Sequence, residues 1–574
     1  MHSPTLDSPC LSSRLIRADW LYALAARPAL FPVLLLAVAI WFIAGNQLWP
    51  LLHPDEGRYV GVALEMLHAK EWSTPLLNGM PYFHKPPLFY WLTAASMAVF
   101  GENEFAARLV PALAGLLMVA GLFAFLRRFV HPKRALIAAL ILAVTPLTFG
   151  AAHYANLDLL VAAMISTTIL CGATAVLLNQ QGEGGGQWVL AMYLFAGLGF
   201  MAKGLIGFVL PGSVLLFWLL VERRYVSIRL LLRPSGVALF LLVTLPWLYL
   251  MQSRFPDFLY YYLVYQQFER FAQSGFNNVM PVWFYVAVLL ATMAPWYGKG
   301  MLAVFTRRYW TRQRDASVRR LMWIWLMLIL AFFSIPQSKL VGYILPVLPP
   351  LAFLFAECFQ RALLAHQRPE SSSQATLDVT QTGGGSQHVN LRSVMGLRRS
   401  FLIRMIVCIV LGLAALIYLS HASLRGSSRI AHAMTQASQP TGEPARYYSL
   451  DYYPFDFRFY MGNDPDLFVV SDWNDSALAT KDNWQKELWD AARFKAGQGG
   501  RSHLLQSDAF RQSVCTPERY PRWLLADSRQ MGEFAWLKEV KPYFADGRQR
   551  VYLVPAAVVM PFCANAVSAR SIQP

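Results

Sequence analysis

Charged residues are scarce in this chain. Asp, Glu, Lys and Arg make up 14% of its 574 residues, whereas 56% are hydrophobic. Soluble domains carry about 25% charged residues, so the composition excludes a soluble protein of this size and predicts an integral membrane protein. Acidic residues are fewer than basic ones: the chain has 33 Asp and Glu and 50 Lys and Arg.

The sequence also lacks the internal repeats of many transporters, a strong metal-binding motif and a high cysteine content. It has no internal repeat of the kind on which many transporters are built. It has no cluster of His, Cys, Asp and Glu with strong metal-ligand spacing, so whether a divalent metal binds stays open. Cysteine is rare, with six in the whole chain, and this excludes a disulfide-rich secreted scaffold.

Long apolar runs are what the sequence does contain. A helix needs about 17–25 apolar residues to cross a bilayer, and eleven runs come close: 29–49, 105–126, 134–150, 158–178, 188–202, 204–221, 234–251, 282–304, 320–335, 340–358 and 401–419. The first ends at Leu48-Trp49-Pro50 without a small-residue cleavage site, so we expect a retained helix rather than a signal peptide. Residues 86–100 open with two prolines and are expected to form an interfacial helix. We predict eleven to thirteen transmembrane helices.

Arginines gather in alternate loops, such as those at 127–134, 223–233 and 307–320. The positive-inside rule places these loops in the cytoplasm, so the net charge of +17 needs no nucleic acid. The loop between 51 and 104 is mainly acidic and is expected outside. With the N-terminus in the cytoplasm, an odd number of spans would put the C-terminus outside as well.

The last 150 residues or so form a second predicted domain, at 421–574, after a transmembrane domain at 1–420. Strand-like runs lie at 447–448, 467–470, 523–526 and 550–554, with a helical pattern around 484–494. This pattern predicts a small α/β domain. Its two cysteines, Cys515 and Cys563, would form a disulfide in an oxidising compartment or remain as two thiols.

Charged and aromatic side chains gather at the predicted outer boundary of the membrane. They come from His53-Pro-Asp-Glu-Gly-Arg-Tyr59, from Tyr82-Phe-His-Lys-Pro-Pro87 and from the ends of later apolar runs. Lys, Arg and Tyr suit a phosphate, whereas carboxylates suit a cation, a proton or a metal. Such a mixture favours an enzyme that transfers a sugar from a lipid phosphate, because cations would stabilise the leaving phosphate.

Several of these residues also have a purely structural explanation. Lys203 would reach the interface as a snorkelling side chain, and Asp158 would cap a helix. The segment 257–272 has an aromatic helical face that would lie among headgroups. Lys339 and Tyr343 are spaced to share a helix face, in a proline-rich stretch that predicts a broken helix.

These motifs resemble the GT-C glycosyltransferases, which use lipid-phosphate sugars. Together with Lys203-Gly204 and Ser338-Lys-x-x-x-Tyr-x-x-Pro346, they resemble the bacterial branch related to protein O-mannosyltransferases, and most closely its lipid A 4-amino-4-deoxy-L-arabinose transferases. The resemblance covers roughly residues 29–360. It implies an α-helical polytopic fold with interfacial helices in the first outer loop. It also implies transfer of aminoarabinose from undecaprenyl phosphate to lipid A phosphates at the periplasmic face of the bacterial inner membrane, which would give resistance to cationic antimicrobial peptides.

The resemblance also implies residue roles. Asp55 matches the essential carboxylate of the first loop, Asp158 a second outer carboxylate, and Lys85 the phosphate-binding lysine. The other expected substrate contacts are Arg58, Tyr59, Tyr82, His84, Lys203, Arg270, Lys339 and Tyr343. His84 departs from the family pattern, which has an acidic residue there, and this puts a metal or sugar contact at that position in doubt.

The role of Asp55 depends on the acceptor. A lipid A phosphate is already anionic and needs no general base, so Asp55 would position groups or balance charge. A hydroxyl acceptor on a protein or glycan would make it the base. Such a related transferase is the first alternative, and a lipid-phosphate transporter or flippase is the second. The expected partners are an undecaprenyl-phosphate sugar, lipid A and membrane lipids, around a monomer.

Overall fold

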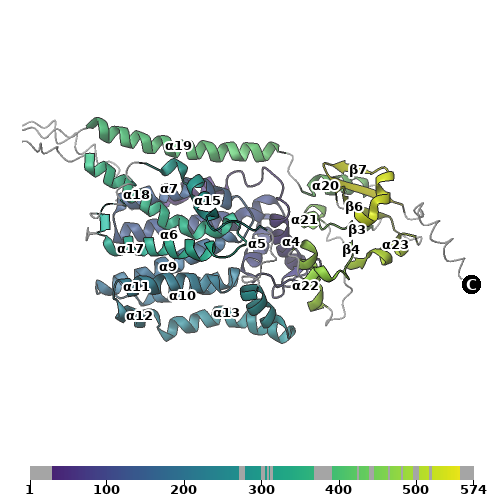
Figure 1. The fold of residues 1–574 in the computed structure, drawn as a ribbon, viewed down its shortest axis with the longest axis horizontal. Helices are drawn as coiled ribbons and strands as arrows, with labels where there is room; N and C mark the ends of the chain where they lie inside the picture. Colours follow the sequence, from purple (N-terminus) through teal and green to yellow (C-terminus); the bar gives the residue numbers. More distant parts are fainter. Residues whose placement is uncertain are drawn as a thin grey trace, which may run out of the picture.

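The computed structural model consists of a bundle of helices and, at one end of it, a smaller α/β domain (Figure 1). The structure describes residues 27, 29–269, 278–298, 301, 304, 306, 309–310, 315–366, 391–422, 426–438, 445–462, 466–479, 483–495, 503–515, 520–529 and 531–555. We refer to residues 51–103, between the first two long helices of the bundle, as the first loop, and to residues 428–555 as the C-terminal domain.

Each of the eleven predicted spans overlaps helical structure, but not every one is a helix of membrane-spanning length. The helices of the bundle are α3 (Leu30–Ile43), α6 (Glu104–Phe129), α7 (Pro132–Val144), α8 (Pro146–Ala152), α9 (Asp158–Gln180), α10 (Gly186–Lys203), α11 (Ile206–Val221), α12 (Tyr225–Leu231), α13 (Pro234–Arg254), η1 (Tyr260–Glu269), α15 (Phe284–Thr292), η2 (Ala294–Trp296), α17 (Ala316–Ser334), η4 (Val341–Val347), α18 (Leu348–His366) and α19 (Leu391–His421). Among the described residues, six helices are long and apolar enough to cross a membrane, or seven if the bent pair α7 and α8 is one span. The protein is therefore a polytopic membrane protein.

One predicted span is wrong in its extent. The run 282–304 was expected to be one bilayer-length helix, but α15 has only nine residues and ends at Thr292. The chain then makes the short turn η2, which contains Pro295. Proline has no backbone N–H and its ring clashes with the preceding turn, so the α-helix stops there.

The first loop contains two helices separated by a small hairpin. Its elements are α4 (Asp55–His68), β1 (Leu76–Leu77), β2 (Met80–Pro81) and α5 (Leu88–Phe100). Asn78 and Gly79 join the two strands and both have positive φ, which is the backbone of a tight two-residue hairpin turn. The hairpin directs the chain towards Tyr82, the first residue after it.

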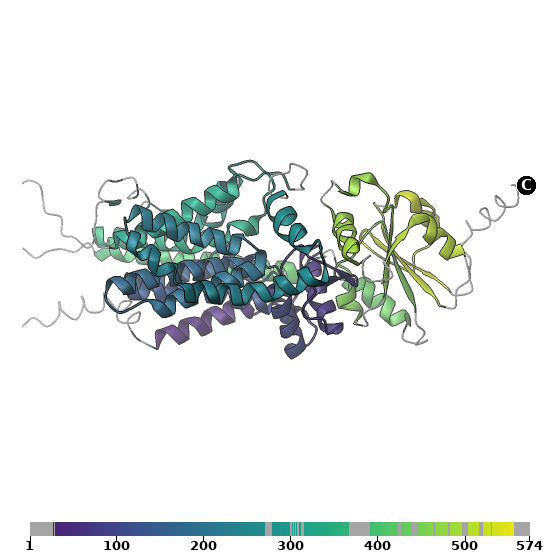
Figure 2. The ribbon, with the colours of Figure 1, turned by 90° about the horizontal axis from the view of Figure 1, so that it is seen from below.

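The C-terminal domain contains a six-stranded sheet, as Figure 2 shows at the end away from the bundle. Its elements are α20 (Ser428–Ser438), β3 (Arg446–Leu450), α21 (Phe457–Met461), β4 (Leu467–Ser471), η5 (Ser476–Ala479), α22 (Trp484–Lys495), β5 (Leu504–Gln506), α23 (Ser507–Cys515), β6 (Arg522–Asp527), η7 (Gly532–Glu539), β7 (Phe544–Asp546) and β8 (Gln549–Val554). The four predicted strands and the predicted helix are confirmed as β3, β4, β6, β8 and α22.

The sheet has the strand order β5-β4-β3-β6-β8-β7, and its first four strands are parallel. Both faces are buried, as parallel sheets require. On β6, Leu524 and Ala526 pack on one face with Phe510 of α23, whereas Trp523 and Leu525 join the large apolar core that continues into the bundle. This alternation follows from the two-residue period of a strand.

The C-terminal domain sits directly on the first loop. Gly57 of α4 packs against the loop after β3, where an added Cβ would lie 2.8 Å from the backbone nitrogen of Asp456. Gly61, one turn along, faces the carbonyl of Phe455. The missing side chains let the two backbones approach closely. The helix α12, which lies in the arginine-rich stretch 223–233, is at the other end of the bundle (Figure 1).

Candidate active site

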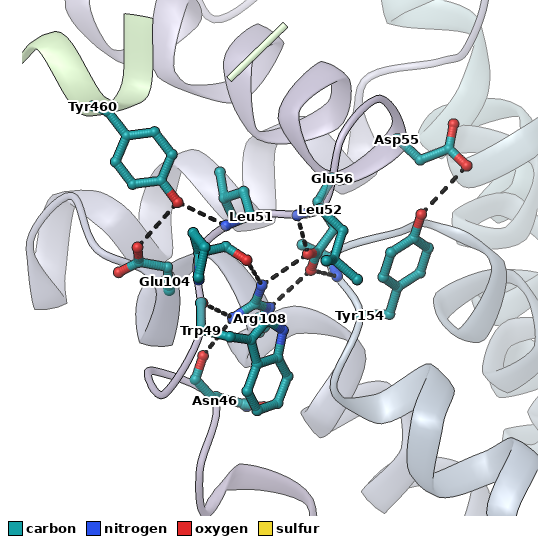
Figure 3. Close-up of polar contacts among 12 residues, drawn as sticks. Asn46, Trp49, Leu51, Leu52, Asp55, Glu56, Glu104, Arg108, Tyr154 and Tyr460 are labelled. Atoms are coloured by element: carbon teal, nitrogen blue, oxygen red, sulfur yellow. Dashed lines mark hydrogen bonds and ion pairs between the residues drawn. The ribbon is translucent and has the colours of Figure 1, made fainter. Parts of the chain in front are cut away.

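The first turn of α4 sends its two acidic side chains in opposite directions, as Figure 3 shows. Glu56 points into the bundle and is fully buried. Asp55 points the other way and accepts a hydrogen bond from the hydroxyl of Tyr154 at 3.3 Å. The Asp-Glu pair of the first motif therefore combines a site residue with a structural one.

Glu56 forms a bidentate ion pair with Arg108 of α6, at 2.8 and 2.7 Å. Neither side chain is exposed to solvent. Three backbone carbonyls accept the remaining Arg108 contacts, from residues 46, 49 and 50, and the backbone amides of residues 52 and 155 donate to Glu56. Buried charges are tolerated when they are paired and hydrogen-bonded in this way. The cluster fixes the backbone that carries Asp55.

Arg58 links Asp55 to the C-terminal domain. Its guanidinium donates to Asp55 on one side and to Glu487 of α22 on the other. Burial disfavours its charged form, but the attraction of Glu487, with a smaller contribution from Asp55, outweighs burial and raises the pKa of Arg58. Arg58 is therefore a fixed cation between two carboxylates.

Tyr82 also binds Glu487 of α22. Its hydroxyl donates to Glu487 at 3.1 Å, and its ring stacks on His84 with the centroids 4.6 Å apart. Burial raises the pKa of Tyr82, so the phenol remains a neutral donor. The hairpin before it is held by Glu65, which accepts hydrogen bonds from the backbone amides of Asn78 and Gly79 at 2.7 and 2.8 Å.

His84 faces a second carboxylate of α22, Asp490. Its Nε2 lies 3.8 Å from Oδ2 of Asp490, which also accepts a hydrogen bond from Tyr261 of η1 at 3.1 Å. Lys486, one turn earlier on α22, lies 3.5 Å from Oδ1. Burial alone would raise the pKa of Asp490, but the contacts with His84, Lys486 and Tyr261 outweigh it and hold this pKa below its ordinary value.

A second ion pair joins the ends of two bundle helices. Asp158 is the first residue of α9 and Lys203 the last of α10, and the ammonium donates to the carboxylate. The same ammonium lies 4.0 Å from the ring centre of Tyr343, a cation–π contact. Gly342 makes room for this arrangement, because an added Cβ there would lie 2.2 Å from Oδ2 of Asp158.

Tyr59 lies beside the first ion pair, with the guanidinium carbon of Arg58 5.8 Å from its ring centre. Desolvation raises its pKa against the opposing charge of Arg58, and the carboxylates of Asp55 and Asp158 add to the rise. Both carboxylates are therefore within electrostatic reach of one phenol. The distances place six of the predicted site residues in two groups: Asp55, Arg58 and Tyr59 in one, and Asp158, Lys203 and Tyr343 in the other.

The structural explanations offered by the sequence fail for two residues. Lys203 does not snorkel, since it is 9% exposed and paired with Asp158. Asp158 directs its side chain to that lysine, and its own backbone amide binds the side chain of Asn156. The segment from 257 is helical as predicted; Tyr261 and Tyr262 are buried inside the protein, whereas Tyr260 is 61% exposed, and contact with headgroups stays a prediction.

Lys339 is placed differently from its prediction. It precedes η4, and its ammonium donates to the carbonyls of Met280 and Pro336. The predicted helix face shared with Tyr343 is wrong, because Lys339 lies outside any helix, the chain is extended at Leu340, and it turns as a 3-10 helix only from Val341. The predicted break in this span is confirmed. The lysine satisfies backbone carbonyls that the break exposes.

Four predicted residues need separate mention. Lys85 is half-buried between His84 and the two prolines that precede α5. Arg270 and Cys563 lie outside the described residues. Cys515 is disulfide-bonded, and its pairing with Cys563 stays a prediction.

Among the described residues, no three His, Cys, Asp or Glu side chains come together as a metal site.

Sequence reasoning missed the residues that α22 contributes, Glu487 and Asp490. One available signal was position, because Glu487 lies in the first turn of a helix that follows a predicted strand. Ligand sites in α/β domains form at the carboxyl ends of such strands. Tyr90 was missed too; its hydroxyl is fully buried and has no hydrogen-bond partner among the described residues.

Comparison with known proteins finds sugar transferases that are similar to this chain. The model of the dolichyl-phosphate-mannose-protein mannosyltransferase family matches residues 84–250. The undecaprenyl phosphate-α-4-amino-4-deoxy-L-arabinose arabinosyl transferase 2 of Pseudomonas fluorescens is 33% identical over 343 residues, which cover 60% of this chain and 61% of that protein. The corresponding transferase of Pseudomonas aeruginosa is 33% identical over 341 residues, covering 59% and 61%. The chain thus matches about 61% of the length of these relatives.

A solved structure extends the similarity to nearly the whole chain. ArnT from Cupriavidus metallidurans, bound to undecaprenyl phosphate, superposes with a TM-score of 0.71 at 23% identity, over 93% of this chain and 100% of that one. Its apo form gives a TM-score of 0.70. The similarity includes the C-terminal domain, because it covers more than the bundle. The protein therefore has the polytopic membrane fold of the GT-C glycosyltransferases, and it is similar to ArnT.

Proposed function

We propose that this protein transfers 4-amino-4-deoxy-L-arabinose from undecaprenyl phosphate to a phosphate group of lipid A. The names of the relatives from Pseudomonas and the undecaprenyl phosphate in the Cupriavidus ArnT structure support this donor. The observation that carries the proposal is the presence of two ion pairs, Asp55–Arg58 and Asp158–Lys203, each with a tyrosine ring beside its cation. Such a site offers both signs of charge to one ligand.

The donor headgroup has charges that complement these pairs. Its phosphodiester is an anion, which a lysine or arginine can bind, and its amino sugar carries an ammonium, which a carboxylate can bind. Lys203 and Arg58 are mostly withdrawn from water, and electrostatic interactions are stronger in such surroundings. On binding, the phosphate would take the place of a carboxylate partner, which is then free to face the ammonium.

The reaction then needs little proton transfer. The bond between the anomeric carbon and the undecaprenyl phosphate oxygen breaks, and its electron pair leaves with that phosphate. An anionic oxygen of the lipid A phosphate bonds to the same carbon, so a phosphodiester forms without a general base. Preorganised cations would stabilise the charge that grows on the leaving phosphate. Asp55 would stabilise positive charge on the sugar and keep Arg58 in place.

The orientation follows from charge. The arginine-rich loops would lie in the cytoplasm, and the candidate site with the C-terminal domain would lie at the periplasmic face of the bacterial inner membrane. We expect one chain to suffice, because the described residues of a single chain form both ion pairs. Loss of negative charge on lipid A would weaken the binding of cationic antimicrobial peptides.

Transfer by purified protein in detergent tests the proposal. Wild-type protein, the undecaprenyl-phosphate aminosugar and lipid A should yield a lipid A species heavier by one aminoarabinose, detected by mass spectrometry. The D55N variant should lose this activity almost completely. The matched control is D257N, because Asp257 is an exposed carboxylate next to η1; it should retain the wild-type rate.

The same assay separates the alternatives. Transfer only to a protein or glycan hydroxyl would point to the related transferase and would make Asp55 the general base. A flippase would give no product in detergent, where there are no two compartments. Wild-type turnover by D55N would refute the assignment of Asp55.

A further inference from the structure

The C-terminal domain reaches the site through one carboxylate. Glu487 of α22 uses both oxygens: Oε1 accepts from the guanidinium of Arg58 and Oε2 accepts from the hydroxyl of Tyr82 at 3.1 Å. Its side chain is 8% exposed. Arg58 and Tyr82 lie more than 400 residues earlier in the chain, in two separate motifs of the first loop. A residue of another domain therefore fixes two predicted substrate contacts relative to each other.

The fold explains why a carboxylate lies there. The helix α22 connects the parallel strands β4 and β5, so its N-terminus lies at the carboxyl edge of the sheet, where α/β domains commonly bind ligands. Here that edge faces the first loop, since the loop after β3 packs against Gly57 of α4. An acidic side chain in the first turn of a helix is also electrostatically favourable.

A simple interdomain salt bridge is the competing explanation, but the domain is docked by other contacts. Arg458 of α21 pairs with Glu65 at 3.2 Å. Tyr460 of the same helix binds the amide of Leu51 at 2.6 Å and Glu104 at 3.1 Å (Figure 3). These contacts involve none of the predicted substrate groups. Docking therefore does not require Glu487, whose two partners are both predicted substrate contacts.

We propose that Glu487 is a positioning residue, through which the C-terminal domain completes the active site. It holds the Arg58 guanidinium and the Tyr82 hydroxyl in one orientation, so that the donor headgroup meets preorganised groups. This inference rests on the proposed transfer reaction. A misplacement of about 1 Å in such a group costs roughly 100-fold in rate, so loss of this carboxylate is expected to lower kcat/KM by about 10- to 100-fold.

Four full-length variants test the proposal in the detergent assay: E487Q, E487D, Y82F and the double variant Y82F/E487Q. E487Q should lose about 10- to 100-fold in kcat/KM. The double variant should lose little more than the worse single one, because both substitutions break the same contact. The control is D508N, since Asp508 is an exposed acid in the first turn of α23; its rate should equal that of the wild type.

E487D distinguishes a role of Glu487 in positioning its partners from a role of its negative charge alone. It also tests the proposal if E487Q does not fold. It keeps the negative charge but moves the carboxylate back by one methylene. A positioning role predicts that E487D also loses at least fivefold in rate at an unchanged melting temperature, whereas an interdomain charge predicts wild-type activity. Rates within twofold of wild type for E487D, or multiplying losses in the double variant, would overturn the proposal. A wild-type protein without transfer activity would instead refute the proposed function.

Discussion

At the scale of single residues, adjacent side chains in the first motif have opposite tasks. Asp55 faces Arg58 and Tyr154, at the site, whereas Glu56 is paired with Arg108 inside the bundle. The sequence alone predicts only that both acids lie in the first loop. It cannot tell which of the two is paired internally, because the partner of Glu56 is 52 residues away on another helix.

The buried pair leads to a prediction about stability. R108M leaves the Glu56 carboxylate buried without its counter-charge, which costs about 3–5 kcal/mol in comparable proteins. We expect a large fall in the detergent melting temperature, and a loss of transfer, because the backbone that carries Asp55 is no longer fixed.

Two further variants check the cause. The double variant E56Q/R108M removes both charges and should recover part of the lost stability, since replacing both partners costs less than removing one. R128M removes one partner of the Arg128–Glu183 pair, whose side chains are 48% and 53% exposed, and it should leave the melting temperature unchanged. Equal melting temperatures for R108M and R128M would show that the buried pair has no such role.

At the scale of elements, sequence patterns predicted what each segment forms better than what it touches. The strands β3, β4, β6 and β8 follow from short β-branched and aromatic runs, whereas β5 and β7, with three residues each, are too short to leave a pattern. The location of α22 was predicted as well. Its contacts with Tyr82 and His84 were not, because periodicity within one helix does not reveal which distant loop packs against it.

The contact between α22 and the first loop predicts a pH dependence. The pKa of Asp490 in the folded protein lies below its ordinary value of 3.8. Such a group contributes stability that is fully present above the unfolded-state pKa and is lost as the pH falls through the folded-state value. D490N should therefore lower the melting temperature at pH 7, and the difference from wild type should shrink below about pH 4.

Melting curves of wild type, D490N and the exposed-acid control D508N between pH 3 and 7 measure this effect. D508N should follow the wild type throughout, because an exposed acid has little to lose on protonation. A gap between wild type and D490N that grows as the pH falls would have the opposite sign and would contradict the assignment.

At the scale of the whole molecule, the candidate site contains residues from two regions that the sequence predicts as separate domains. The bundle supplies the Asp158–Lys203 pair, the first loop supplies Asp55 and Arg58, and α22 supplies Glu487. Their meeting depends on how closely the C-terminal domain approaches α4, a distance that no local pattern encodes. Gly57 is the one local signal of this approach. A glycine inside a helix is unfavourable by about 1 kcal/mol relative to alanine, so its presence in α4 suggests that another part of the chain packs closely there.

Gly57 gives the last prediction. Alanine would favour α4 as a helix by about 1 kcal/mol, but its Cβ would lie 2.8 Å from the backbone nitrogen of Asp456, which cannot move as a flexible side chain would. Overpacking of this kind typically costs 1–3 kcal/mol, so the contact should prevail and G57A should loosen the docked domain. Transfer should fall by more than tenfold, with faster hydrogen exchange in residues 451–456. The matched control is G212A in α11, where an added Cβ meets nothing within 4 Å; it should leave activity and exchange unchanged. If G57A instead behaved like G212A, close docking of the C-terminal domain would not be what assembles the site.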